Sequence, residues 1–197
     1  MTPYFETEES TETKEPEIVE TQLELDTYRK ELEILARERM PIFFGNSGAL
    51  HGSIVLSTIF KNCSDKIRMY VKDLSGEVES LAPDFIENLT HFVEEKGTLK
   101  IVADVDIKNG TELKQKLDSL KTSGYDVQVK LASDEFKDIQ DKLFRNFKYF
   151  TIGDDSMFRL ELDSKKHTAI CNFNQPEDAK NIINTFEKYF PNCVPLF

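Results

Sequence analysis

The chain has 197 residues, 39% of them hydrophobic and 31% charged, so one domain can bury a core without disulfides or a structural metal. The formal net charge is −11, and residues 1–26 hold nine acidic residues and one lysine, which leaves −3 for residues 27–197. This balance argues against a general binder of duplex nucleic acid, which needs a positive surface, although a local basic patch stays open.

The cysteines and the absence of a long apolar run point to a reducing compartment and no membrane span. Cys63, Cys171 and Cys193 are odd in number and widely spaced, and no CxxC pair predicts a metal site. The N-terminus is acidic, whereas a secretory signal begins with basic residues followed by an apolar stretch. We therefore expect a cytoplasmic protein with no metal, no cofactor and no membrane contact.

The N-terminal region divides into an acidic tail and a helix. Residues 1–17 have too few apolar side chains to offset the cost of ordering, and we expect them to be disordered. Residues 18–41 follow a helical pattern that Pro41 ends. The apolar stripe of this amphipathic helix consists of Ile18, Leu25, Tyr28, Leu32 and Leu35. The stripe is too short for a stable coiled coil. It can dock on its own domain, meet a second copy or receive another protein, and we expect it to mediate association.

Residues 42–197 are expected to form one α/β domain. The small-residue stretch 45–53 predicts a loop that leads into a helix. Strands and helices then alternate, as apolar spacing of two and of three to four residues indicates. The strands are expected at 67–74, 99–105 and 125–131, and the helices at 83–96, 111–123 and 134–145, the last with Ser133 as N-cap.

After residue 146 the pattern changes to short strands. Three strand candidates, 147–152, 157–162 and 168–173, are separated by turn-rich sequence and predict antiparallel hairpins. A final helix is expected at 176–190, with Asn174 and Glu177 placed like a capping pair. The predicted fold class is α/β, with a mixed β-sheet in which parallel β-α units precede antiparallel hairpins, layered by helices.

This order of elements, over most of residues 48–190, resembles one half of the phospholipase D-like superfamily. Local support lies in residues 148–190, where YFTIGDDSMFRLEL and AICNFNQPEDAKNIINTFEKYF are similar to that family's last strands and closing helix. Enzymes of the family carry His-x-Lys, four further residues and an Asp. The His attacks phosphorus and the Lys holds the phosphate.

The motif that the resemblance implies for an enzyme is missing. His51 precedes Gly-Ser, His91 precedes Phe-Val and His167 precedes Thr-Ala, so no histidine has a lysine two residues on. The corresponding strand offers only Asn146, Lys148 and the pair Asp154 and Asp155. Because a nucleophile is absent, the resemblance implies a relative that is not an enzyme.

Small polar residues form the first candidate site. Backbone N–H groups at a helix N-terminus can bind an anion, and the residues beside them here are Asn46, Ser47, His51 and Ser53. The stretch matches neither GxGxxG nor GxxxxGK[ST], so a plain connecting loop is the favoured alternative. His51 can bind phosphate or act as an acid or base, but a lone histidine is more often structural.

Charged residues form the other candidates. In the cluster Asp154, Asp155, Arg159 and Glu161, the last two share one face of a strand and the aspartates cap its turn. Paired acids can bind a divalent cation, yet Gly-Asp-Asp-Ser is also an ordinary hairpin turn, which we favour. The end of a predicted parallel strand, an edge where α/β sheets bind ligands, carries Asp104 and Asp106, with simple solvation as the favoured alternative. Two basic clusters read as solvated faces: Lys165, Lys166 and His167, and Lys61, Lys66 and Arg68.

We therefore expect a non-catalytic phospholipase D-like domain that acts as an interaction or regulatory subunit of a larger cytoplasmic assembly. By analogy with stand-alone relatives, the setting is a prokaryotic or phage system for nucleic-acid handling or defence. The expected partner is a protein or a second copy bound through the N-terminal helix, and nucleic acid is not supported by charge. One alternative is a phosphoesterase or nuclease-like enzyme that uses His51. Another is an acidic inhibitor whose tail imitates a polyanion.

Overall fold

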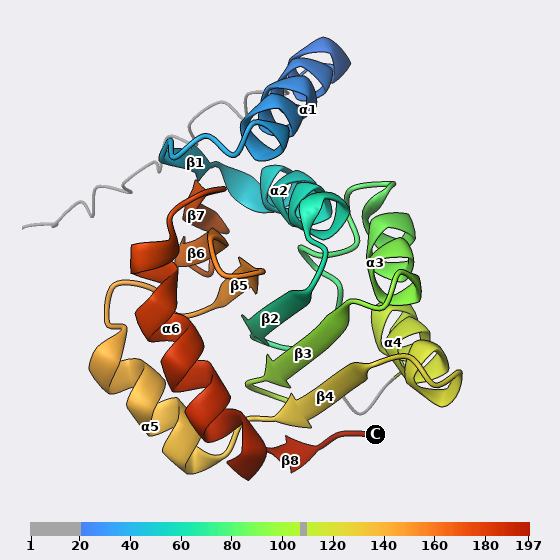
Figure 1. The fold of residues 1–197 in the computed structure, drawn as a ribbon, viewed down its shortest axis with the longest axis vertical. Coiled ribbons are helices and arrows are strands. Elements are labelled where there is room, and N and C mark those ends of the chain that lie inside the picture. The colour runs from blue at the N-terminus through green and yellow to red at the C-terminus, as the bar shows by residue number, and fades with distance from the viewer. Residues whose placement is uncertain (1–20, 107–109) are drawn as a thin grey trace, which may run out of the picture.

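The computed structural model describes residues 21–106 and 110–197, which form an eight-stranded mixed sheet with helices on both faces (Figure 1). The strands are β1 (Phe44–Asn46), β2 (Lys66–Val71), β3 (Thr98–Ala103), β4 (Val127–Leu131), β5 (Phe150–Gly153), β6 (Met157–Asp163), β7 (Thr168–Asn172) and β8 (Val194–Pro195). The helices are α1 (Gln22–Arg37), α2 (Gly48–Asn62), α3 (Phe85–Glu94), α4 (Glu112–Thr122), α5 (Asp134–Leu143) and α6 (Pro176–Tyr189), with a short 3-10 turn at Phe190–Asn192. In these residues no helix is both long and apolar enough to cross a bilayer.

The sheet has the order β1-β7-β6-β5-β2-β3-β4-β8. Helices α3 and α4 return the chain between β2, β3 and β4, so these strands are parallel. Tight turns join β5, β6 and β7, which are antiparallel, and β5 also pairs antiparallel with β2. The expected mixed sheet, with parallel units followed by antiparallel hairpins, is confirmed.

Two apolar clusters occupy the two faces of this sheet. Helices α2, α3 and α4 cover one face and α5 and α6 cover the other, while α1 lies outside α2 (Figure 1). Strand alternation supplies both clusters, because Ile67 and Met69 of β2 face the first and Tyr70 faces the second. Phenylalanine fills much of both, and seven rings are fully buried. These rings are Phe60, Phe85, Phe136, Phe150, Phe158, Phe173 and Phe186.

The stretch 45–53 is not the loop that its small residues predict. Gly45 and Asn46 belong to β1, which pairs with β7, and α2 already begins at Gly48. A Cβ at Gly52 would lie 3.0 Å from an Arg159 Nη2 atom, and the Ser53 side chain is buried. The small residues therefore reflect the close approach of α2 to the sheet, a packing demand that resembles a loop in sequence.

Other predicted boundaries shift by a few residues. The strand predicted at 147–152 begins at Phe150, and the strand β8 after the last helix was not predicted. Ser133 caps α5 as expected. The capping pair Asn174 and Glu177 was wrong: the N-cap is Gln175 without a side-chain bond, and Asn174 Nδ2 instead donates to the Arg39 carbonyl.

The described part of the apolar stripe of α1 packs on the chain's own domain, which was one of the three alternatives, and an associative role of the helix stays a prediction. Leu32 is 1% exposed, and Leu25, Tyr28 and Leu35 pack against the same core. Polar contacts fix the helix in place, because Arg29 donates to Asp84 at 2.9 Å. Its N-terminus carries a capping box of Thr21 and Glu24. Ile18 and the tail 1–17 lie outside the described residues.

Candidate functional site

The four residues of the predicted anion site do not converge. Asn46 is buried and structural: its Oδ1 accepts from Arg159 Nε at 3.0 Å, and its Nδ2 donates to the His167 carbonyl at 2.7 Å. Ser53 is equally engaged, since its hydroxyl donates to the Glu79 carbonyl and accepts from the Ala82 N–H. Neither side chain is available to a ligand.

The other two residues of that set lie at the first turn of α2. Ser47 Oγ is 3.0 Å from His51 Nδ1, and the His51 ring lies against the Tyr28 ring of α1, tilted by 33° with the ring centres 4.4 Å apart. His51 is thus part of the α1–α2 packing. His51 does not line the cavity that contains Arg159 and Glu161.

The predicted cluster of Asp154, Asp155, Arg159 and Glu161 divides into two parts. Asp154 lies in the β5–β6 turn with φ of 46° and accepts backbone N–H bonds from Ser64, Asp65 and Lys66. Asp155 is exposed near Arg68. Both aspartates therefore lie in a hairpin turn, the favoured alternative, and Asp154 ties that turn to the segment before β2. Among the described residues, no group of three or more His, Cys, Asp or Glu is placed to hold a metal ion.

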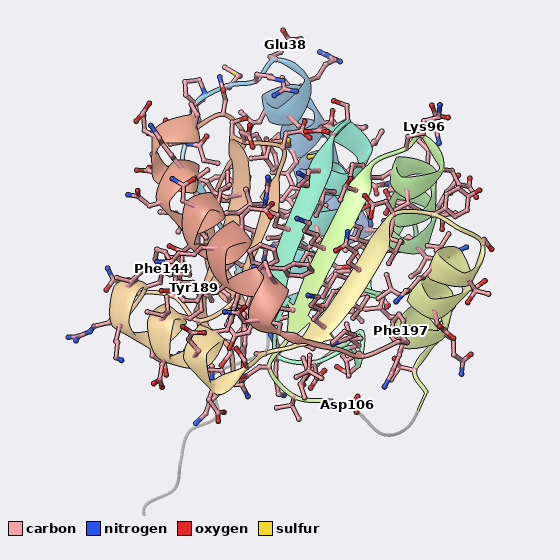
Figure 2. All side chains as sticks on the ribbon, turned by 60° about the horizontal axis from the view of Figure 1, so that its bottom comes forward. Glu38, Lys96, Asp106, Phe144, Tyr189 and Phe197 are labelled. Carbon is pink, nitrogen blue, oxygen red and sulfur yellow. The ribbon has the colours of Figure 1, made fainter. Side chains whose placement is uncertain are left out.

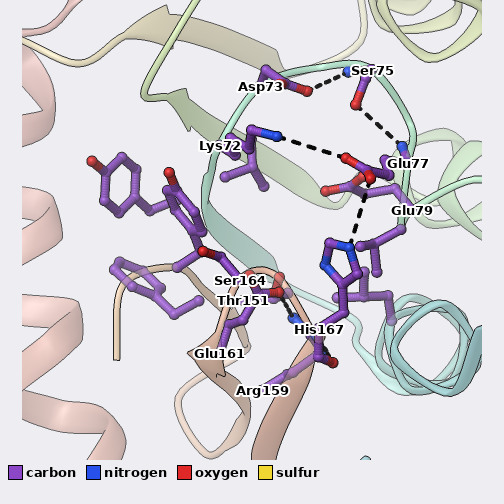
Figure 3. Close-up of a pocket in the computed structure, with 16 residues that line it drawn as sticks. Lys72, Asp73, Ser75, Glu77, Glu79, Thr151, Arg159, Glu161, Ser164 and His167 are labelled. Carbon is purple, nitrogen blue, oxygen red and sulfur yellow. Dashed lines mark hydrogen bonds and ion pairs between the residues drawn. The ribbon is translucent and has the colours of Figure 1, made fainter. Parts of the chain in front are cut away.

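Arg159 and Glu161 instead form the base of a cavity of about 40 Å³, here called the strand-end pocket, which has room for a few water molecules (Figure 3). It opens where β2 ends, between the loop 72–79, the lead-in and first residues of β5, β6 and the β6–β7 turn. Its polar lining consists of Tyr70, Lys72, Asp73, Ser75, Glu77, Glu79, Tyr149, Thr151, Arg159, Glu161, Ser164 and His167.

The base of the pocket is a buried ion pair. Arg159 Nη1 donates to Glu161 Oε2 at 3.0 Å, and the two side chains are 5% and 7% exposed. The same guanidinium donates from Nε to Asn46 and from Nη2 to the His167 carbonyl at 3.2 Å. Arg159 thereby joins β1, β6 and the β6–β7 turn, and its charge is compensated inside the protein.

Two distant segments of the chain meet in the lining of the pocket. His167 Nε2 lies 3.8 Å from Glu77 Oε1, and Lys72 Nζ lies 3.7 Å from Glu77 Oε2 (Figure 3). His167 has a φ of 53°, in the left-handed region where histidine, asparagine and aspartate occur more often than most residues, at the end of the β6–β7 turn. Because it lines the pocket, His167 is a stronger candidate than the basic cluster with Lys165 and Lys166 indicated.

Glu79 is the carboxyl of the pocket with the most perturbed acidity. Burial raises the pKa of Glu79 to about 7, the positive charge of Arg159 partly opposes this shift, and Glu161 adds to it. The residue as a whole is half-buried, but its carboxyl group lies inside the protein. The pKa of the Glu79 carboxyl therefore lies close to neutral pH.

A second polar cluster shares Tyr70 and Tyr149 with the pocket and surrounds Asp104, at the end of β3. The Tyr70 hydroxyl donates to Asp104 Oδ1 at 3.0 Å, and the Tyr149 hydroxyl donates to Oδ2 at 3.3 Å. Lys137 Nζ lies 3.0 Å from Oδ1, and Lys148 Nζ lies 3.7 Å from Oδ2. Partial burial acts to raise the pKa of Asp104, but hydrogen bonds from Lys137 and Tyr70 outweigh it, and the pKa lies below its ordinary value.

The structure separates Asp104 from Asp106, which the sequence grouped. Both aspartates follow β3, and Figure 2 shows Asp106 at this end of the sheet, opposite the end with Lys96, which lies just before β3. Asp106 is solvent-facing and pairs with Lys114 at 2.9 Å, as the solvation alternative predicted, whereas Asp104 is mostly buried. Sequence reasoning did not single out Glu77, Glu79 or Lys137, because no local motif marks them. Their roles depend on contacts across the sheet.

No protein-family model matches the chain, and no curated protein matches it in sequence. Solved structures do match. Nuc from Salmonella typhimurium, a phospholipase D family member, is 15% identical with a TM-score of 0.52, over 78% of this chain and 98% of Nuc. NucT from Helicobacter pylori is 11% identical with a TM-score of 0.52, over 79% of this chain and all of NucT.

A third match is TrmBL2, an archaeal chromatin protein with a described mode of DNA binding, at 15% identity and a TM-score of 0.54. It covers 89% of this chain, which spans 64% of TrmBL2. At these identities the likeness concerns the fold. The chain has a phospholipase D-like α/β fold, as its order of elements predicted.

Proposed function

We propose that this chain is a non-catalytic domain with a phospholipase D-like fold that serves as an interaction or regulatory subunit of a larger cytoplasmic assembly. The observation that carries the proposal is the state of Arg159. The guanidinium at the base of the strand-end pocket is already bound by Glu161, Asn46 and the His167 carbonyl. A substrate phosphate would have to compete with a carboxylate at 3.0 Å.

The placement of the histidines supports the same proposal. His51 packs beside Tyr28, and His91 is exposed on the last turn of α3. His167 lines the pocket, but it faces the carboxylate of Glu77 and has no lysine two residues on. Lys148, in the segment that resembles the catalytic strand, is paired with Asp104. None of the three histidines therefore stands in the His-x-Lys arrangement, and Lys148 is already paired with a carboxylate.

Exposed apolar residues near the N-terminus support the interaction role. Eleven large hydrophobic residues of the described chain are exposed, and six of them lie between residues 23 and 50. The six are Leu23, Ile34, Met40, Ile42, Phe43 and Leu50. Leu23 and Ile34 both lie on α1 outside its buried stripe, and we propose that this outer side of α1, rather than the buried stripe, meets the partner. The match to TrmBL2 fits a setting in which nucleic acid is handled, although the net charge gives no support for direct binding.

A turnover assay tests the proposal. Purified full-length chain should leave bis(p-nitrophenyl) phosphate and single-stranded DNA intact, and light scattering with added host extract fractions should identify a stable complex. His167→Ala tests whether any hydrolysis depends on the pocket, because His167 is the histidine that lines it. His51→Ala is its matched control outside the pocket. Hydrolysis that persists through purification and disappears in His167→Ala would overturn the proposal in favour of an enzyme.

The enzyme alternative that used His51 extends to His167, because His167 is the histidine that lines the pocket. The alternative of an acidic inhibitor concerns residues 1–20, which lie outside the described residues. Deleting residues 1–20 and measuring partner binding tests it, since a polyanion mimic would lose binding with the deletion.

A further inference from the structure

The surroundings of Asp104 have the composition of an anion-binding site. Two phenol hydroxyls and two ammonium groups converge on one carboxylate, and they come from β2, from α5 and from the residues that lead into β5. Charged and hydroxyl donors in this arrangement are what proteins present to phosphate and related oxyanions. Lys137 and Lys148 place two positive charges beside the one carboxylate of Asp104, and the carboxylates of Asp73 and Asp141 act on the two phenols from farther away.

We propose that Tyr70, Tyr149, Lys137 and Lys148 form an oxyanion-binding cradle at the end of β3, and that the Asp104 carboxylate occupies it as an internal ligand that excludes phosphate. The location agrees with this role, because ligands of open α/β sheets bind at the carboxyl ends of parallel strands. In this chain the residue directly after β3, where such a ligand would bind, is Asp104.

The cradle is held by contacts that do not involve the Asp104 side chain. Tyr70 is buried between the rings of Phe136, at 5.1 Å, and Tyr149, at 5.3 Å. Lys137 Nζ also donates to the backbone carbonyl of Asp104 at 2.7 Å, a bond that survives substitution of the side chain. Removing the carboxylate should therefore leave Tyr70, Tyr149 and Lys137 close to their present positions, and Lys148 Nζ keeps its place 5.3 Å from the centre of the Tyr149 ring.

The cradle is also reachable from solvent. The Lys148 side chain is 54% exposed, whereas that of Asp104 is 14% exposed. An anion could therefore approach past Lys148 and meet the phenols at the floor. In the present chain Asp104 already lies there, and a second anion would meet its negative charge.

Phosphate binding by variants tests the proposal without any turnover measurement. Asp104→Ala should bind inorganic phosphate saturably, at least about tenfold more tightly than the unchanged chain, as expected for several charge-assisted hydrogen bonds. Asp106→Ala is the matched control, because Asp106 lies two residues away, pairs with Lys114 and contacts neither tyrosine. Calorimetry with phosphate against chloride at equal ionic strength separates binding from screening.

Each outcome decides the matter. Adding Lys148→Gln to Asp104→Ala should abolish the gained affinity, and Asp106→Ala should gain none. Should Asp104→Ala fold only in part, phosphate must raise its folded fraction in circular dichroism more than chloride does, and the smaller Asp104→Ser must show the same calorimetric gain. Folded Asp104→Ala and Asp104→Ser proteins that bind no phosphate would overturn the cradle. Equal phosphate affinity in the unchanged chain would overturn the exclusion by Asp104.

Discussion

Arg159 Nη1 lies 3.0 Å from Glu161 Oε2 on one face of β6, and both side chains are more than nine-tenths buried. Removing one partner of such a pair leaves an uncompensated charge in the protein. Glu161→Gln should therefore lower the free energy of unfolding by about 3 kcal/mol, measured by urea denaturation. The double variant Arg159→Met with Glu161→Leu should lose less than the two single losses added together, because it leaves no isolated charge.

The matched control is an exposed pair. Asp138 and Lys142 are one helical turn apart on α5 at 3.9 Å, and both are largely exposed. Asp138→Asn should change stability by less than about 1 kcal/mol. If Glu161→Gln costs no more than Asp138→Asn, the pair does not organise the strand-end pocket.

Glu79 predicts a loss of stability with rising pH. Burial raises its pKa to about 7 from an ordinary 4.5, so the folded state holds a proton that the unfolded state releases between these values. The stabilisation is complete below pH 4.5 and is lost as pH rises through about 7. The loss is at most roughly 3 kcal/mol, at about 1.4 kcal/mol per pKa unit.

Comparison with Glu79→Gln isolates this effect. Other carboxyls with lowered pKa, such as those of Asp84 and Glu187, act in the opposite direction but at lower pH, and they are unchanged in the variant. The stability difference between Glu79→Gln and the unchanged chain, measured by urea denaturation, should grow in favour of the variant from pH 5 to pH 8. Parallel curves would show that Glu79 titrates normally.

The buried positions of a helix could be predicted from the sequence, whereas a contact between distant segments could not. The buried positions Leu113, Leu117 and Leu120 of α4 follow from their helical spacing, which is a local signal. The contact between Glu77 and His167 joins residues that are ninety positions apart, and it depends on the register of β6 against β7 and on the path of the loop 72–79. Fold class was thus predictable from periodicity, whereas the pocket required the tertiary structure.

The same limit explains the wrong loop at residues 45–53. A glycine that permits a turn and a glycine that permits close packing look identical in sequence. Gly52 is of the second kind, since a Cβ there would lie 3.1 Å from Val78 Cγ1. Asp104 shows the reverse case: its position at a strand end was predictable, but its four donors were not.

The tyrosines beside Asp104 should lose their protons only at a pH well above that of an ordinary tyrosine. Burial, followed by the negative charge of Asp104, raises the pKa of both Tyr70 and Tyr149 well above that of an ordinary tyrosine. Asp104→Asn should lower both pKa values, because the charge is removed, yet leave them above the ordinary value, because burial remains. NMR of isotope-labelled tyrosine rings in alkaline titration measures the change, with Tyr149→Phe used to assign the signals. An unchanged titration in Asp104→Asn would show that the carboxylate does not act on these phenols.

The two sides of α1 should respond differently to substitution. Leu32 is 1% exposed beneath the helix, while Leu23 is 75% and Ile34 is 48% exposed on its outer side. Leu32→Ala should cost about 2–4 kcal/mol in urea denaturation, because it opens a cavity between α1 and the core. Leu23→Asp with Ile34→Asp should leave that stability within about 1 kcal/mol, since neither side chain fills a core position.

For association we expect the reverse: the double variant on the outer side of α1 should lose it, and Leu32→Ala should keep it. If the outer side of α1 meets a partner or a second copy, the Leu23→Asp and Ile34→Asp double variant lowers the mass seen by light scattering or the yield of the complex, because each change puts a charge into an apolar contact. Leu32→Ala should retain association when it is measured without denaturant, at a temperature at which the variant stays folded. Loss of association in Leu32→Ala alone would mean that the buried stripe detaches from the domain to bind, and that the covered position of Leu32 is only one of two states of the helix.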